Sequence, residues 1–149
     1  MRKIGLSTAS ALLIAMLLVY CKKSSEHLNI ILHSKPLSVI QSYLQGKWEL
    51  RYMNGGISTQ TIQQTNYFWQ FRSKDRITET NQGTITADTT ITWKRDLGLF
   101  SGTDSTYLMN FFDKQGVPWV YVIDGIYNDT LLLHDNAVDG FYYHFTKSN

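Results

Sequence analysis

The stretch GKWELRYM, residues 46–53, decides the fold, because from here on apolar residues recur at every second position. Strict alternation of apolar and polar side chains predicts a β-strand with one buried and one solvated face. The alternating residues are Trp48, Leu50 and Tyr52 on the apolar side and Lys47, Glu49 and Arg51 on the polar side.

Seven further segments with the composition of strands follow, separated by turn residues. They are rich in aromatic and β-branched residues, which favour strands. Together with the first segment they predict about eight antiparallel strands. A parallel sheet is not predicted, because the strands do not alternate with helices. The segments are NYFWQFR (66–72), RITET (76–80), TITADTTITW (84–93), STYLMNFF (105–112), PWVYVID (118–124), LLLHD (131–135) and FYYHFTK (141–147).

We therefore expect an all-β domain over residues 36–149, an antiparallel up-and-down barrel preceded by one short helix. A train of hairpins must protect its edge strands, and closure into a barrel removes the edges. A sandwich of two sheets is the competing solution. The helix is predicted in PLSVIQSYLQG (36–46), where apolar residues recur at steps of three and four between a proline and a glycine.

The N-terminus has the pattern of an export signal. Arg2 and Lys3 precede an uncharged apolar segment, residues 11–20. That segment is shorter than the roughly 20 residues of a membrane-spanning helix. The chain's one cysteine, Cys21, follows it directly.

LVYC (18–21) resembles the lipobox of bacterial lipoproteins, in which the cysteine becomes the first residue and carries acyl chains such as palmitate. The resemblance implies a signal peptide over 1–20, an acylated cysteine with a tether over 21–35, and attachment to the outer membrane or the periplasmic face of a bacterial envelope. Tyr20 departs from the small residue that is usual before the cysteine. An ordinary signal peptide or a hydrophobic membrane tether with an incidental Cys21 is the alternative.

Charge and composition exclude several classes of protein. The 14 Lys and Arg residues and 12 Asp and Glu residues of the chain balance once Arg2 and Lys3 leave with the signal. A neutral mature chain offers no electrostatic case for nucleic acid. An acylated Cys21 leaves no thiol for a disulfide, a nucleophile or a cysteine-rich zinc site. Aromatic residues at 13% speak against disorder.

LQGKWEL (44–50) and the hairpins after it are similar to the lipocalin-like domains of bacterial surface lipoproteins. Gly46-Lys47-Trp48 resembles the lipocalin GxW motif, and DGFYYHFTK (139–147) resembles the last strand of those domains. In lipocalins an arginine of the final strand packs over the motif tryptophan, whereas only Lys147 is available here. A TDY-like motif between later strands is missing.

The inward face of the predicted barrel is rich in aromatic residues. These side chains could line a ligand site, because ligands sit in the mouths of barrels among aromatic rings and a few polar groups. They could equally plug the interior, since an eight-stranded barrel is only just wide enough for its own side chains. The residues that share this parity are Trp48, Trp69, Trp93, Tyr107, Trp119, Tyr121, Tyr143 and Phe145.

The sequence contains no GxSxG, HExxH or glycine-rich phosphate motif. His134 and His144 lie on neighbouring predicted strands near Asp135, but histidines without a fixed helical spacing are usually surface or edge residues. The loop DNAVDG (135–140) is similar to a calcium loop but lacks two required ligands, since Ala137 replaces the third-position oxygen ligand and Thr146 stands where a bidentate Glu is needed. We expect no catalytic residues, metal or cofactor.

Three Asp-Ser/Thr triplets, beginning at Asp88, Asp104 and Asp129, are similar to the O-glycosylation acceptor of exported proteins in Bacteroidetes. The preference of Asp, Ser and Thr for turns explains these triplets equally well.

Together these patterns predict a membrane-anchored, non-enzymatic, lipocalin-like barrel that binds a small apolar or amphiphilic molecule. The alternative is a protein-interaction or scaffold module of the cell envelope, whose barrel interior is solid. An enzyme is the third hypothesis. It would need a cleft in which His134 or His144 meets a carboxylate.

Overall fold

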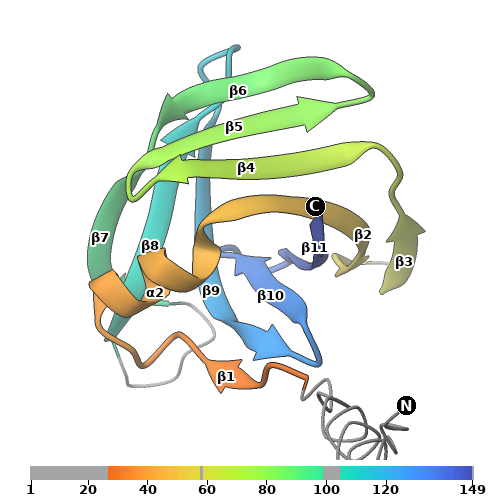
Figure 1. Ribbon diagram of the computed structural model, residues 1–149. Helices are drawn as coiled ribbons and strands as arrows, with labels where there is room; N and C mark the ends of the chain where they lie inside the picture. Colours follow the sequence, from red (N-terminus) through yellow and green to blue (C-terminus); the bar gives the residue numbers. More distant parts are fainter. Residues whose placement is uncertain (1–26, 58, 99–104, 149) are drawn as a thin grey trace, which may run out of the picture.

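The computed structural model of the chain (Figure 1) describes residues 27–57, 59–98 and 105–148. In this part of the chain a short helix precedes a series of strands, and every strand pair is antiparallel. The elements are β1 (Ile30–Ile31), α2 (Leu37–Leu44), β2 (Gly46–Gly55), β3 (Gln60–Gln63), β4 (Tyr67–Ser73), β5 (Arg76–Asn81), β6 (Thr84–Thr90), β7 (Thr92–Leu97), β8 (Ser105–Phe112), β9 (Pro118–Tyr127), β10 (Thr130–Asp135) and β11 (Phe141–Ser148).

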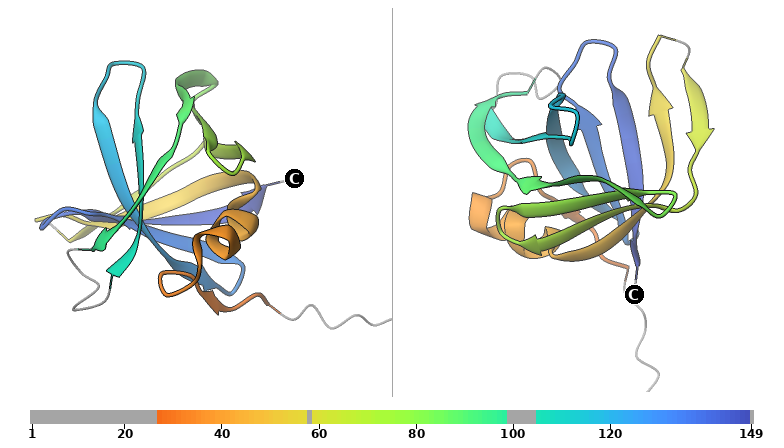
Figure 2. Two further views of the ribbon diagram at one scale, coloured as in Figure 1. Left: turned by 90° about the vertical axis from the view of Figure 1, so that its left-hand side faces the viewer. Right: turned by 90° about the horizontal axis from the view of Figure 1, so that it is seen from above.

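The strands form one sheet that curls into a half-barrel (Figures 1 and 2). Their order is β6-β5-β4-β2-β11-β10-β9-β8-β7, while β1 and β3 pair off this path with β9 and β2. β6 and β7 therefore lie at opposite ends of the order, although they are neighbours in the chain. The predicted all-β, antiparallel, barrel-like fold with a short helix before it is confirmed, and the chain does not form a sandwich of two sheets.

The segment predicted as one strand, TITADTTITW (84–93), is in fact two. β6 ends at Thr90 and β7 begins at Thr92, with Ile91 buried between them. The Ile91 N–H donates to the Asp75 carbonyl oxygen at 2.7 Å, which holds this corner against the β4–β5 turn. Threonine and isoleucine favour strands on both sides of the corner, so their pattern does not reveal it. Here the chain passes from one end of the sheet to the other.

The helix α2 leads into β2 through Gly46, Lys47 and Trp48. Gly46 has φ +102°, a backbone conformation that glycine adopts without steric cost. Trp48 is buried, and its Nε1–H donates to the Leu44 carbonyl oxygen at 2.7 Å. Lys147 of the last strand holds its Nζ 4.3 Å from the centre of the Trp48 ring and donates to the Gln45 carbonyl oxygen. Lys147 of the last strand thus covers the tryptophan ring of the first long strand.

An aromatic cluster fills the interior of the half-barrel around Trp69. Trp69 is fully buried, and the rings of Phe111, Tyr121 and Phe145 lie 5.7, 5.0 and 4.8 Å from it, centre to centre. Aromatic pairs at these separations stabilise a core beyond the burial of their area. This part of the interior is therefore plugged by side chains.

The described end of the predicted tether, residues 27–35, lies against the sheet. β1 pairs with β9, and Leu32 is fully buried. The Asp129 carboxylate binds Nδ1 of His27 at 2.6 Å and accepts from the Leu28 N–H at 2.8 Å. The apolar residues that follow Leu28 thus contribute one strand and one core side chain.

The contact of Lys147 with Trp48 predicts a measurable loss of stability on substitution. Lys147→Ala removes a cation–π contact and a charge-assisted hydrogen bond, so we expect the free energy of unfolding to fall by about 1–2 kcal/mol. Lys147→Arg retains both interactions and should stay close to the wild type. Urea unfolding followed by tryptophan fluorescence measures the difference. Equal midpoints for the alanine and arginine variants would contradict the assigned role.

Candidate functional site

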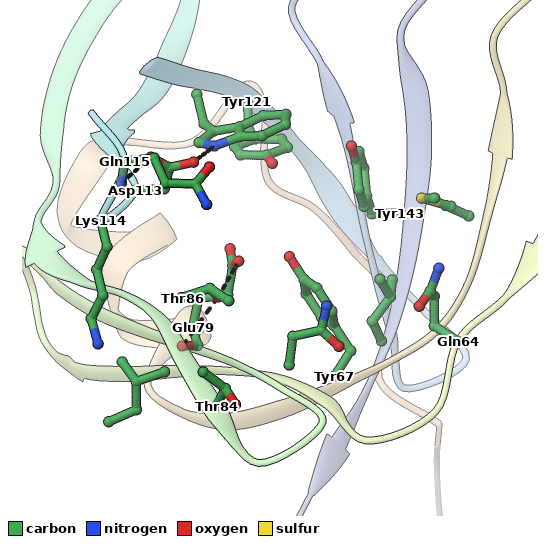
Figure 3. A pocket seen from close by; sticks show the side chains of 15 residues that line it. Gln64, Tyr67, Glu79, Thr84, Thr86, Asp113, Lys114, Gln115, Tyr121 and Tyr143 are labelled. Carbon is green, nitrogen blue, oxygen red and sulfur yellow. Dashed lines mark hydrogen bonds between the residues drawn. The ribbon is translucent and has the colours of Figure 1, made fainter. Parts of the chain in front are cut away.

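A cavity of about 510 Å³ opens at one end of the half-barrel (Figure 3). It lies between β2, β4, β5 and β6 on one side and the β8–β9 hairpin on the other, with β11 at its back. Its lining combines apolar and polar groups. The apolar side chains are Leu50, Met53, Ile85 and Trp119, and the polar ones include Gln64, Tyr67, Glu79, Thr86, Tyr121 and Tyr143.

Glu79 of β5 brings a carboxylate to the wall of the cavity. The residue is only 9% exposed. Trp69 lies opposite it on β4 and donates its Nε1–H to Oε2 at 3.1 Å, while the Thr86 hydroxyl donates to Oε1 at 2.5 Å. No lysine, arginine or histidine among the described residues forms an ion pair with this carboxylate. Neutral donors therefore hold it.

Three tyrosine side chains line the cavity from β4, β9 and β11 (Figure 3), and the Tyr143 hydroxyl donates to the Asp135 carboxylate. Burial raises the pKa of Tyr67, Tyr121 and Tyr143 far above the ordinary value of a phenol. The carboxylate of Glu79 adds to this effect at Tyr67. The phenols therefore stay neutral at physiological pH, and each can donate or accept a hydrogen bond.

The β8–β9 turn forms one lip of the cavity and is organised by Asp113. Its carboxylate accepts the Val117 N–H at 2.8 Å and the indole N–H of Trp119 at 3.3 Å. The hydrogen bond from Val117 is the main cause that lowers the pKa of Asp113. The Lys114 N–H donates to the Thr86 carbonyl oxygen at 2.9 Å, which joins this turn to β6. The lip is thus held to the opposite end of the sheet order.

The structure divides the predicted ligand-binding residues into three groups. Trp119, Tyr121 and Tyr143 line the cavity. Trp48 and Trp69, like Phe145, are buried in the core. The remaining two, Trp93 and Tyr107, lie partly buried against the core on β7 and β8, and Tyr107 borders a smaller cavity of about 240 Å³.

Sequence reasoning missed two polar residues of the cavity, Glu79 and Thr86, and did not select Tyr67. A signal for Glu79 was present in the alternation of RITET. Ile77 pairs with Phe71, and Glu79 lies two residues further, opposite Trp69 on the same face. A carboxylate is rarely buried, so its residue type gave no reason to select Glu79, although the alternation of RITET puts it on the same face as Ile77.

The two histidines of the last hairpin lie in different surroundings. His144 binds the Asn54 side-chain oxygen through Nε2 at 2.7 Å and stacks on Tyr52 at 4.1 Å between ring centres. His134 holds Nδ1 3.1 Å from the Asp135 carbonyl oxygen. The Asp135 carboxylate accepts the Tyr143 hydroxyl at 3.2 Å and the backbone N–H that begins β11, so it organises the hairpin.

Several predicted features lie outside the described residues. These are the signal peptide, Tyr20, Cys21 and Asp104, which begins one of the glycosylation-like triplets. The two other triplets begin with paired carboxylates, since Asp88 binds Arg76 at 2.9 Å and Asp129 binds His27.

The titration of Asp135 predicts a distinctive dependence of stability on pH. Burial raises the pKa of Asp135 in the folded state, so its contribution to stability falls as the pH rises from about 3 to about 7. Asp135→Asn removes this contribution, and its free energy of unfolding relative to the wild type should therefore rise over that range. Asp88→Asn is the matched control with the opposite sign, because the hydrogen bond from Arg76 lowers the pKa of Asp88.

Urea unfolding of the wild type and both variants at the two pH values measures these differences. A relative stability of Asp135→Asn that declines as the pH rises would contradict the assignment.

Neither a metal cluster nor a membrane-spanning helix occurs among residues 27–57, 59–98 and 105–148: three metal-ligating side chains nowhere gather there, and no helix is long and apolar enough to cross a bilayer. Comparisons of the chain with known proteins find no matching family model, no matching curated protein and no matching solved structure.

Proposed function

We propose that the chain is a non-enzymatic, lipocalin-like binding protein that holds a small amphiphilic molecule in the cavity at the end of its half-barrel. The observation that carries the proposal is the cavity itself. Its volume of about 510 Å³ lies within the roughly 300–1,000 Å³ of typical ligand sites. It is open to solvent at one end, while the core around Trp69 closes the other.

The lining favours an amphiphile over a wholly apolar ligand. Leu50, Met53 and the ring of Trp119 offer apolar surface. The Glu79 carboxylate and the phenolic hydroxyls lie on the same cavity, and polar groups that face a site lose free energy unless a ligand or water binds them. A molecule with one apolar part and one polar head satisfies both kinds of surface.

The GxW motif supports the lipocalin-like part of the proposal. Trp48 is buried at the start of the first long strand, and Lys147 of the last strand covers its ring. This pairing of first and last strands is what the resemblance implies for a lipocalin-like barrel.

We further propose that acylated Cys21 anchors the chain to a bacterial envelope membrane, the outer membrane or the periplasmic face. The described chain begins beside the end of β9 that carries Tyr127, whereas Pro118 begins β9 at the lip of the cavity. The whole length of β9 thus separates the start of the described chain, residue 27, from the opening, as Figure 1 illustrates. A ligand could then enter from the aqueous side.

Exposed apolar side chains on the lip support a second candidate, docking of an envelope protein. Phe112, Val117 and Trp119 at the end of the β8–β9 hairpin are 59%, 43% and 36% exposed. An exposed apolar patch of this kind is typical of interaction sites. Under this alternative, substitution of Phe112 would weaken partner binding without altering the cavity, which Phe112 does not line.

Blocking the cavity should abolish ligand binding. The probe is 6-bromo-1-hexanol, whose bromine quenches nearby indoles, titrated into the full chain in lipid nanodiscs. Thr84 lines the cavity mouth and is exposed, so Thr84→Phe should weaken binding about tenfold or more by filling the opening. Thr90→Phe, at an exposed position on the same strand outside the cavity, should bind as the wild type does. Equal quenching of both variants would contradict binding in this cavity.

The anchor can be tested separately from the cavity. In a bacterial host that processes lipoproteins, the wild-type chain should incorporate labelled palmitate and remain with the membrane fraction, because several acyl chains hold a protein stably. Cys21→Ser should incorporate no label. A wild-type protein that carries a free Cys21 thiol, detected by mass spectrometry, would rule out the lipoprotein assignment.

A further inference from the structure

We propose that the polar head of the ligand is a cation, an alkylammonium group, bound by the Glu79 carboxylate within the phenols of Tyr67, Tyr121 and Tyr143. This inference rests on the proposed function and names the chemical class that the same cavity selects. Figure 3 shows the four side chains converging on one region of the cavity.

The Glu79 carboxylate has no ion-pair partner among the described residues. A carboxylate accepts about four hydrogen bonds, and its donors here, Trp69, Thr86 and the hydroxyl of Tyr67, are all neutral. A nearly buried carboxylate ordinarily has a cationic partner, because removing its charge from water costs much free energy. Among the described residues no such partner forms an ion pair with Glu79. A cationic ligand head would supply the missing charge.

Aromatic rings form part of the cavity lining beside Glu79. Tyr121 meets Tyr143 edge to face at 5.4 Å, and Trp119 stacks on Tyr121 at 6.2 Å between ring centres. The faces of such rings attract ammonium groups, and aromatic enclosures bind quaternary ammonium ligands. Phenolic oxygens that remain neutral can also accept hydrogen bonds from a primary ammonium.

The other charged groups of the lining do not neutralise the negative charge of Glu79. Lys114 is a basic residue of the lining, but its side chain extends away from the Glu79 carboxylate in Figure 3. Asp113 adds a second negative charge, already engaged by Val117 and Trp119. The potential in the cavity therefore favours a cationic head and opposes an anionic one.

The test compares three ligands that share one bromoalkyl tail and differ only in the charge of the head. They are (6-bromohexyl)trimethylammonium, 6-bromo-1-hexanol and 6-bromohexanoate. Each is titrated into the full wild-type chain in lipid nanodiscs, with empty nanodiscs as the blank, and quenching of tryptophan fluorescence gives the dissociation constant. We expect the ammonium to bind about tenfold more tightly than the alcohol, and the carboxylate to bind more weakly than either.

Glu79→Gln removes the charge but keeps an oxygen that can accept from Trp69. This variant should lose the preference for the ammonium over the alcohol and retain its affinity for the alcohol. Glu49→Gln is the matched control, because Glu49 faces the outside of the sheet and pairs with Arg51 at 3.0 Å. It should keep the wild-type preference.

The possible outcomes separate this inference from the proposed function. If the alcohol quenches the wild-type chain and the ammonium binds no more tightly, the cavity binds amphiphiles but the inference is wrong. A tenfold preference that survives in Glu79→Gln also overturns it, because Glu79 is then not the source. If none of the three ligands binds, the proposed function itself fails. The comparison of ligands on the wild type needs no variant to fold.

Discussion

The hydrogen bond from the Trp69 indole to the Glu79 carboxylate joins the two halves of the interior. On one side of it the rings of Phe111, Tyr121 and Phe145 pack on Trp69 and leave no room for a ligand. On the other side the carboxylate faces the cavity. Trp69 and Glu79 lie opposite each other on adjacent strands, so the pairing of β4 with β5 sets the boundary between the solid and the hollow parts. The interior of the half-barrel is therefore filled by side chains around Trp69 and open as a cavity beyond Glu79.

The cavity exists because the sheet does not close with a regular strand ladder. β6 and β7 end the sheet order on opposite sides, and the corner at Ile91 connects them. Where the chain turns this corner the two sides are held together covalently. Farther along β6 the hydrogen bond from Lys114 to Thr86 connects them instead. In the described part of the chain no strand pairing joins β6 to β7 or β8, and the cavity opens beside the Lys114 contact.

Periodicity predicted most of the sheet from the sequence, because one solvated face leaves a clear alternation in strands such as β2. The short strands β1 and β3, the corner at Ile91 and the burial of Glu79 were not predicted, and the last two have clear physical reasons. Ile91 lies in a run of threonine and isoleucine whose strand propensity is the same on both sides of a corner. Glu79 has the parity of the core but the composition of the surface, and only the partner Trp69, which strand register supplies, explains its burial.

The same register explains why aromatic parity alone predicted the site incompletely. Trp119, Tyr121 and Tyr143 line the cavity since their strands pass beside the opening, whereas Trp48 and Trp69 have the same parity at the filled end. Parity decides whether a side chain points inward, but the position along the barrel decides whether it meets a ligand or another ring. That position depends on strand stagger, which only long-range pairing determines.

Glu79 finally connects stability with the proposed binding of a cation. Without a ligand the fold must keep a nearly buried carboxylate with neutral donors only, and this costs free energy compared with a paired charge. A ligand that binds only the folded chain stabilises it by mass action, and an ammonium head would do so partly by relieving that cost. Glu79 would then lower the stability of the ligand-free chain and also determine which ligand the cavity selects. Replacing Glu79 with an apolar residue would remove both effects together, because the cavity would lose its charge and Trp69 its acceptor.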